Sequence, residues 1–133
     1  LPYIYQWTET AEGLSGEEAY LGFAQMDAMR NAALAASKDF DFIISPTAPM
    51  PTYPAEWASP INDPQRPFEH IAFTVAMNMS EQPAISINCG YTAKGLPIGL
   101  QIFGQRFDDL GVLRLAKAYE DMRPVQRPWP VIA

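Results

Sequence analysis

A proline-rich stretch divides this chain and places the strongest limit on its fold. Of the 13 prolines in the 133-residue sequence, those at positions 46, 49, 51, 54, 60, 64 and 67 crowd into one segment. Proline has a fixed φ and no amide hydrogen, so neither a helix nor the interior of a sheet can form at this spacing. The stretch predicts an irregular connection of about 20 residues, far longer than the usual ~4 to 6. Tyr53 and Trp57 could anchor it by packing, either as a compact surface loop or as the rim of a site.

Helices are predicted on both sides of this connection. Ser15 to Glu18 reads Ser-Gly-Glu-Glu, a capping box in which the Ser15 hydroxyl and the Glu18 carboxylate each bind the other residue's amide. The helix should run from about residue 16 to 37, and its apolar residues spread over more than one stripe, so it needs neighbours on two sides. Asp108 should cap a last helix at about residues 109 to 122, ending before Pro124. The stripe that should face a sheet is Val112, Leu115, Ala116 and Tyr119.

Strands are predicted at three places. Residues 40 to 45 form a short apolar run that ends at Pro46, and residues 84 to 89 alternate apolar and polar side chains. Together with residues 98 to 103, the alternating segment should form a β-hairpin whose turn, from Gly90 to Pro97, carries Lys94-Gly95 at its tip. Residues 1 to 13 lack periodicity and are predicted to be a loop or arm.

Composition and charge argue against several classes of partner. The net charge of -6 and the pI of about 4.6 repel phosphate backbones and anionic lipids, so neither nucleic acid nor a membrane surface is an expected partner. Cys89 is the only cysteine, which excludes an internal disulfide and, together with the lack of a signal-like or membrane-spanning segment, predicts a cytoplasmic protein. The first residue is Leu rather than Met, which hints at a piece of a longer polypeptide.

The search for chemistry finds no catalytic group. The glycines form no phosphate-binding pattern, and a single histidine with a single cysteine supplies no metal site, so neither a cofactor nor a metal is expected. Cys89 and His70 could pair only by meeting in space, and the alternation of the strand favours Cys89 as a small core residue instead. Ser86 with Lys94 is the one serine–lysine pair to test, although Lys94 reads as a solvated turn residue.

Residues 70 to 79 offer two polar side chains in an otherwise apolar segment, which is predicted to be a short buried helix. Thr74 and Asn78 lie four positions apart and so share one face of such a helix. Two readings stay open: both side chains bind neighbouring backbone groups, or both converge on a ligand.

Five motifs, in order along the chain, resemble the C-terminal third of the amidase-signature enzymes. No single motif is diagnostic, but five in the same order are hard to meet by chance. The resemblance extends over roughly residues 18 to 120. The motifs are residues 42 to 49 (FIISPTAP), 73 to 78 (FTVAMN), 82 to 86 (QPAIS), 89 to 90 (CG) and 95 to 104 (GLPIGLQIFG).

The resemblance implies both a fold and an activity. The fold is the C-terminal portion of an α/β/α domain, here a single unit over residues 1 to 133. It should hold a short mixed sheet with the hairpin at about residues 84 to 104, packed by helices at about 16 to 37 and 109 to 122. The family hydrolyses carboxylic amides to an acid and ammonia or an amine, using a serine nucleophile, a second serine and a lysine. The lysine and the Gly-Ser-rich stretch belong to the family's N-terminal part, so this chain alone is predicted to be inactive.

Two functional hypotheses follow. The first is a fragment of an amidase that helps to line the substrate funnel, with the missing N-terminal part as its partner and a small-molecule amide as substrate in the full enzyme only. The alternative is a stand-alone, amidase-derived binding module without catalysis. A fragment should expose strand edges and apolar helix faces, and so should self-associate. The candidate substrate-binding residues are Phe73, Thr74 and Asn78, followed by Thr47.

Overall fold

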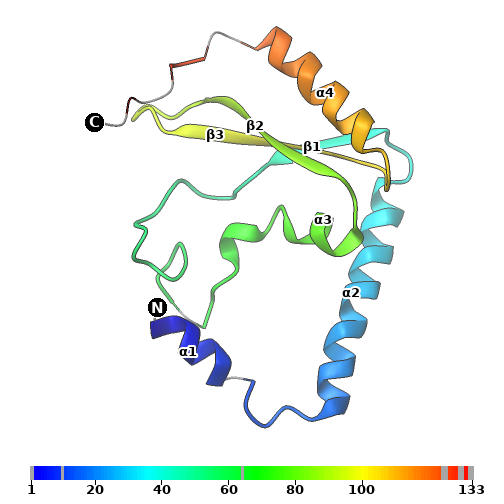
Figure 1. Ribbon diagram of the computed structural model, residues 1–133, viewed down its shortest axis with the longest axis vertical. Coiled ribbons are helices and arrows are strands. Elements are labelled where there is room, and N and C mark those ends of the chain that lie inside the picture. Colours follow the sequence, from blue (N-terminus) through cyan, green and yellow to red (C-terminus); the bar gives the residue numbers. More distant parts are fainter. Residues whose placement is uncertain (1, 10, 64, 124–125, 129–130, 132–133) are drawn as a thin grey trace.

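The computed structural model describes residues 2–9, 11–63, 65–123, 126–128 and 131. Helices and strands are interspersed along these ranges, with one long connection after the first strand (Figure 1). The elements are α1 (Pro2–Glu9), α2 (Gly16–Ser37), β1 (Phe42–Pro46), a 3-10 turn (Glu69–Ile71), α3 (Val75–Ser80), β2 (Ala84–Tyr91), β3 (Pro97–Gly104) and α4 (Asp109–Met122).

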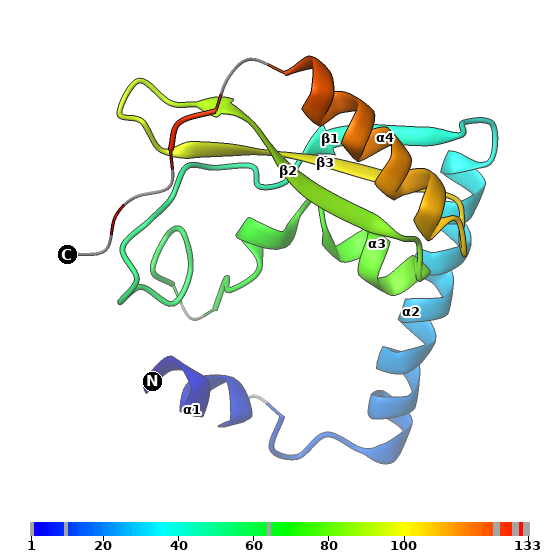
Figure 2. The same ribbon diagram turned by 45° about the horizontal axis from the view of Figure 1, so that its top comes forward.

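The three strands form one sheet in the order β1-β3-β2, with α4 above it and α3 below it (Figure 2). The predicted hairpin is confirmed as β2 and β3, and both long helices lie where they were predicted. The predicted mixed sheet is corrected, since β3 pairs antiparallel with both of its neighbours. The strands β1 and β2 do run in the same direction, but β3 lies between them and prevents a parallel pair.

The core lies between α4 and the face of the sheet that α4 covers. Ile102 of β3 is 1% exposed, and it packs with Ile87 of β2 and Ala116 of α4. Leu115 and Tyr119 pack against this cluster, so the predicted stripe of α4 does face the sheet. Asp108 caps α4 by accepting a hydrogen bond from the Gly111 amide at 3.0 Å, as predicted.

Helix α2 begins at the predicted capping box. The Ser15 hydroxyl accepts from the Glu18 amide at 3.2 Å, and the Glu18 carboxylate accepts from the Ser15 amide at 2.8 Å. The helix packs on α3 along part of its length, while its N-terminal half extends away from the sheet (Figure 1). Tyr20 and Phe23 are about 70% exposed there. The predicted neighbour is therefore present on one side of α2 and absent, among the described residues, on the other.

Acid should loosen the first turn of α2. The Ser15 backbone amide, and after it the Ser15 hydroxyl, donate to the Glu18 carboxylate and lower its pKa below the ordinary value of 4.5. A lowered pKa in the folded state means that the stabilisation is present above pH 4.5 and is lost as the pH falls through the folded value. Helical circular dichroism between pH 6 and pH 3 should therefore show an acid-induced loss that is smaller in Glu18→Gln. Identical curves for the two proteins would contradict this.

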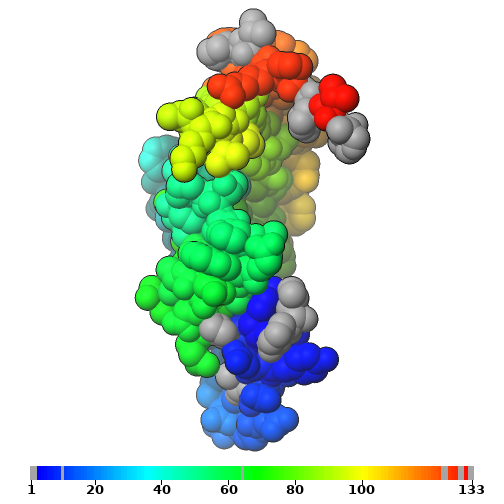
Figure 3. All heavy atoms as spheres, turned by 90° about the vertical axis from the view of Figure 1, so that its left-hand side faces the viewer, coloured from blue at the N-terminus to red at the C-terminus, as the bar shows by residue number. Residues whose placement is uncertain are grey.

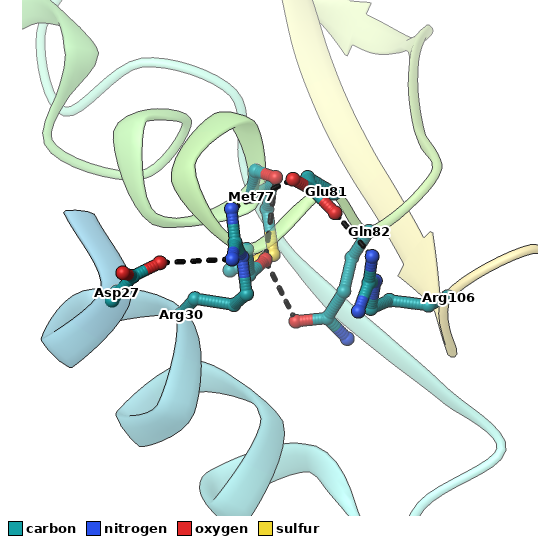
Figure 4. Close-up of polar contacts among 7 residues, drawn as sticks. Asp27, Arg30, Met77, Glu81, Gln82 and Arg106 are labelled. Carbon is teal, nitrogen blue, oxygen red and sulfur yellow. Dashed lines mark hydrogen bonds and ion pairs between the residues drawn. The ribbon is translucent and has the colours of Figure 1, made fainter.

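A carboxylate at the end of α3 joins three elements (Figure 4). Glu81 has a left-handed backbone, with φ of 59°, and its side chain accepts from Arg30 of α2 at 2.7 Å and also pairs with Arg106 after β3. Arg30 additionally pairs with Asp27 at 2.9 Å. Since Glu81 is about half exposed, these ion pairs contribute less to stability than to fixing where α2 and β3 lie relative to α3.

The N-terminal segment differs from the sequence-based prediction. Residues 2 to 9 form helix α1 rather than a loop or arm. The Trp7 ring lies 5.0 Å from that of Tyr3 within the helix and 6.1 Å from that of Phe68, at the end of the proline-rich connection. An eight-residue helix is marginal on its own, so this tertiary contact helps to stabilise it.

The proline-rich connection from Thr47 to Phe68 contains neither helix nor strand in its described residues, as predicted. Tyr53 anchors it through a ring contact with His70 at 6.2 Å, whereas Trp57 is 39% exposed. Within the described ranges, none of the helices combines the length and the apolar character needed to cross a lipid bilayer.

Candidate functional site

A row of polar side chains crosses the sheet on the face opposite α4. Strand register places Ser45 of β1, Gln101 of β3 and Ser86 of β2 side by side. Gln101 is only 3% exposed, and its Nε2 donates to Ser45 Oγ at 3.0 Å and to the Phe73 carbonyl at 2.7 Å. This one amide therefore ties the sheet to the turn that leads into α3.

A glycine makes room for a hydroxyl pair beside this row. The hydroxyls of Thr47, directly after β1, and of Ser86 in β2 lie 2.6 Å apart. Gly99 of β3 lies between these two residues, and a Cβ added there would come within 2.7 Å of Thr47 Oγ1 and 3.0 Å of Ser86 Oγ. Only glycine at this position allows the two hydroxyls to approach each other over the sheet.

Helix α3 and the residue that precedes it, Thr74, bring two further polar side chains to this face. Thr74 Oγ1 donates to the Ile71 carbonyl at 3.2 Å, and Asn78 Nδ2 donates to the Thr74 carbonyl at 2.9 Å. The reading in which both bind local backbone groups is therefore confirmed. Both residues also line a cavity, so the second reading is compatible with the first.

This cavity, the sheet cavity, has a volume of about 370 Å³ and lies between α3 and the polar row. Its polar lining residues come from elements far apart in sequence. Its lining residues are Thr47, Thr74, Met77, Asn78, Gln82, Ala84, Ile85, Ser86 and Gln101.

Gln82 lines the sheet cavity and is fixed by several hydrogen bonds. It is 5% exposed, and its Nε2 donates to Ser37 Oγ at 3.1 Å and to the Gly104 carbonyl at 2.9 Å, while its Oε1 accepts from Ser80 at 3.0 Å. These bonds join the ends of α2, α3 and β3. The backbone of Gln82 is fixed as well, because its amide donates to the Met77 carbonyl at 3.3 Å.

A larger cavity of about 580 Å³ opens where the proline-rich connection meets the far end of the hairpin. Figure 3 shows this side of the molecule, where the hairpin turn lies against the start of the connection. Thr47 lines both cavities. The lining residues are Pro46–Tyr53, His70, Thr92 and Leu96–Gly99.

Three of the four predicted substrate-binding residues, Thr47, Thr74 and Asn78, meet in the sheet cavity. The fourth, Phe73, is 39% exposed, and its carbonyl binds Gln101. Their contact with a substrate stays a prediction.

The two nucleophile pairs considered from sequence are not formed. The Cys89 thiol faces the Ile98 carbonyl at 3.5 Å, whereas His70 contacts Tyr53. Cys89 is half-buried rather than a core residue, because a bulge between Asn88 and Gly90 interrupts the alternation of β2. Lys94 is exposed in the hairpin turn, as predicted.

Gln82 and Gln101 are the residues that sequence reasoning missed. Only Gln101 has a signal in the sequence, because it interrupts the apolar run from Ile98 to Phe103, whereas Gln82 lies between Glu81 and Pro83. A buried amide needs partners for both its donors and its acceptor, so an isolated glutamine in a strand can mark a polar network.

Comparison with known proteins adds independent information. The sequence profile of the Amidase family matches residues 7–113. The chain is 40% identical over 117 residues to a glutamyl-tRNA(Gln) amidotransferase subunit from Thermodesulfovibrio yellowstonii, covering 86% of this chain and 24% of that protein. It is also 40% identical over 124 residues to the protein of the same name from Pseudothermotoga lettingae, covering 86% of this chain and 25% of the relative.

Solved structures share the fold. A crystal structure of an amidase superposes with a TM-score of 0.78 at 20% identity, covering 93% of this chain and 29% of the other. The structure of 6-aminohexanoate cyclic dimer hydrolase complexed with substrate gives a TM-score of 0.68 at 25% identity, with 96% and 28% covered. The chain thus spans about a quarter of the length of the proteins it matches. With its profile match extending from residue 7 to residue 113, the chain belongs to the amidase-signature family and corresponds to one part of such an amidase.

Proposed function

We propose that this chain is the C-terminal part of an amidase that hydrolyses a carboxylic amide to an acid and ammonia or an amine. Residues 1 to 133 form a single unit within that larger domain, and the sheet cavity contributes one wall of the substrate funnel. The observation that carries the proposal is the convergence of Thr47, Thr74 and Asn78 on this cavity from separate elements. Phe73 borders the same wall through its bond to Gln101.

The hydrogen bonds of the sheet cavity favour a ligand that donates. Thr74 Oγ1 gives its one hydrogen to a backbone carbonyl, and Asn78 Nδ2 gives one of its two. What they have left to offer a ligand is mainly acceptor capacity, at Asn78 Oδ1 and the Thr74 oxygen, with the second N–H of Asn78 as the remaining donor. The N–H of a primary or secondary amide would satisfy these acceptors, which agrees with the substrate class of an amidase.

The chain alone should be inactive, because the serine–serine–lysine chemistry of the family has no counterpart here. The sequence has no Ser-Ser or Gly-Gly pair, and its lysines are Lys38, Lys94 and Lys117. Lys94 is exposed in a turn, and Lys117 pairs with Asp121. Ser86 is held by Thr47 rather than by a lysine. If the chain does hydrolyse an amide through Ser86, Ser86→Ala must abolish that activity.

The first experiment is to sequence the coding DNA upstream of Leu1 and to assay the longer polypeptide. An upstream frame encoding a lysine and a Gly-Ser-rich stretch, with amide hydrolysis by the whole protein, would support the proposal. In that protein Asn78→Leu should raise KM by about tenfold, the worth of one hydrogen bond of ~1.4 kcal/mol, with a smaller effect on kcat. Thr74→Ser keeps its hydroxyl and is the control, with KM close to that of the parent. An unchanged KM in Asn78→Leu would remove this residue from the funnel.

The alternative function, a stand-alone binding module, makes a different prediction for the isolated chain. A fragment that exposes apolar residues such as Tyr20 and Phe23 should self-associate, whereas a natural module should be monomeric. Ultracentrifugation over a range of concentrations separates the two, and a monodisperse monomer at high concentration would favour the module. We also propose a cytoplasmic location, which the single free cysteine, Cys89, supports.

A further inference from the structure

The residues that follow α4 turn back onto the β-hairpin. The side chain of Arg123, directly after the helix, is 18% exposed, and its Nη1 donates to the Asn88 carbonyl at 2.9 Å. This carbonyl lies at the bulge between Asn88 and Gly90, where the ladder between β2 and β3 is interrupted and a backbone group can lack a partner on the next strand. Arg123 therefore anchors the chain after α4 to the irregular point of the hairpin.

A second anchor lies at Tyr91, the last residue of β2. The Arg127 amide donates to the Tyr91 hydroxyl at 3.2 Å, and this hydroxyl donates to Gln126 Oε1 at 3.4 Å. The guanidinium of Arg127 lies over the Tyr91 ring, with its central carbon 4.8 Å from the ring centroid, which is the geometry of a cation–π contact. Residues 126–128, which we call the tail, thus lie against the end of the hairpin (Figure 3).

The turn of the hairpin leaves room for Arg127. Gly95 has a φ of 84°, a conformation that glycine adopts without strain. A Cβ added at this glycine would collide with Nη1 of Arg127, so the guanidinium occupies the space that another residue type would fill. The turn itself is closed by Thr92, whose carbonyl accepts from the Gly95 amide at 2.8 Å and whose hydroxyl accepts from the Leu96 amide at 3.1 Å. One arginine therefore contacts both the last residue of β2 and the turn.

The same turn forms part of the larger cavity. Thr92, Leu96 and Pro97 line this cavity together with the proline-rich connection. The tail residues 126–128 do not line it. The tail can therefore act on the cavity only by fixing where the turn lies.

We propose that Arg127 and Tyr91 form a latch, in which the tail holds the hairpin turn in place and thereby sets the shape of the larger cavity. Arg127 is a positioning residue, because it acts on a bound substrate only through the turn. The effect on substrate rests on the proposed function, whereas the latch itself can be measured in a protein without activity.

Hydrogen exchange of the turn in the complete protein measures the latch. In Arg127→Ala, peptides that cover residues 92 to 96 should exchange about two- to fivefold faster, the contribution of an exposed cation–π contact. Arg127→Lys keeps a cation over the ring and should retain most of the protection. Arg114→Ala removes an exposed arginine from the middle of α4 and is the matched control, with parental exchange. Unchanged exchange in Arg127→Ala, or an equal change in Arg114→Ala, overturns the inference.

Gly95→Ala opens the latch from the other side. The alanine carries backbone strain of its own at a φ of 84°, and its Cβ also displaces the guanidinium of Arg127. With the latch already open, a further Arg127→Ala change should add little to the rate of exchange, because the two changes remove the same contact. Effects that multiply as if independent would show that Arg127 does not hold the turn.

The role in substrate binding has a separate readout. If the complete protein hydrolyses an amide, Arg127→Ala should raise KM by about two- to fivefold and leave kcat near the parental value, as expected for a loss of uniform binding. Arg127→Lys should restore most of the parental KM. Faster exchange of the turn with an unchanged KM overturns the role in positioning substrate. Faster exchange in a protein that hydrolyses no amide would refute the proposed function and leave the latch intact, whereas an active enzyme with unchanged exchange would do the reverse.

Discussion

Ile102→Ala should lower the free energy of unfolding by about 2–5 kcal/mol, the largest effect expected of any single change in this chain. Ile102 is 1% exposed at the centre of the cluster that joins β2, β3 and α4. Truncation removes buried methyl and methylene groups and leaves a cavity that the rigid sheet cannot close. Urea denaturation followed by tryptophan fluorescence or circular dichroism measures the change.

The control for this experiment lies on the same strand and the same face. Ile98 is 43% exposed, so Ile98→Ala removes the same atoms from a position that is already partly in water. Its cost should be well under half that of Ile102→Ala. Equal losses from the two variants would mean that the core does not lie between α4 and the sheet as described.

Gln101→Leu should cost about 1–3 kcal/mol of stability, because the part-buried hydrogen bond from Gln101 to the Phe73 carbonyl would be lost. The side chain keeps roughly its volume in this change, so the loss reports on hydrogen bonding rather than on packing. In the longer polypeptide, the same variant should reduce kcat/KM as well, since Gln101 ties the turn before α3 to the sheet and thereby positions Thr74 and Asn78. Thermal unfolding and steady-state kinetics give the two readouts.

Ser45→Ala provides the comparison for Gln101. It removes the hydroxyl that accepts from Gln101 Nε2 and leaves the bond to the Phe73 carbonyl in place. Its effect should be near ~1 kcal/mol or below, the net worth of one hydrogen bond between neutral groups. If Ser45→Ala were as harmful as Gln101→Leu, the contact with Phe73 could not be the reason for the buried glutamine.

Features that depend on neighbouring residues could be predicted from the sequence. The capping box at Ser15, the cap at Asp108, the hairpin turn and the irregular proline-rich connection all lie where their residue types placed them. Each is governed by interactions over three to five positions, which the order of residues specifies directly. The stripe of α4 is similar, because helical periodicity alone decides which of its side chains share a face.

Features that depend on distant residues were decided by the tertiary structure. Helix α1 is stabilised by the contact between Trp7 and Phe68, which lie some 60 positions apart in the sequence. The residues of α1 show no helical pattern from which the helix could have been predicted. The bulge in β2 moved Cys89 out of the core, and the register of three strands brought Gln101 between Ser45 and Ser86. The partners of a polar side chain are set by which strands become neighbours, and that choice is made by the packing of the whole sheet rather than by any local run of residues.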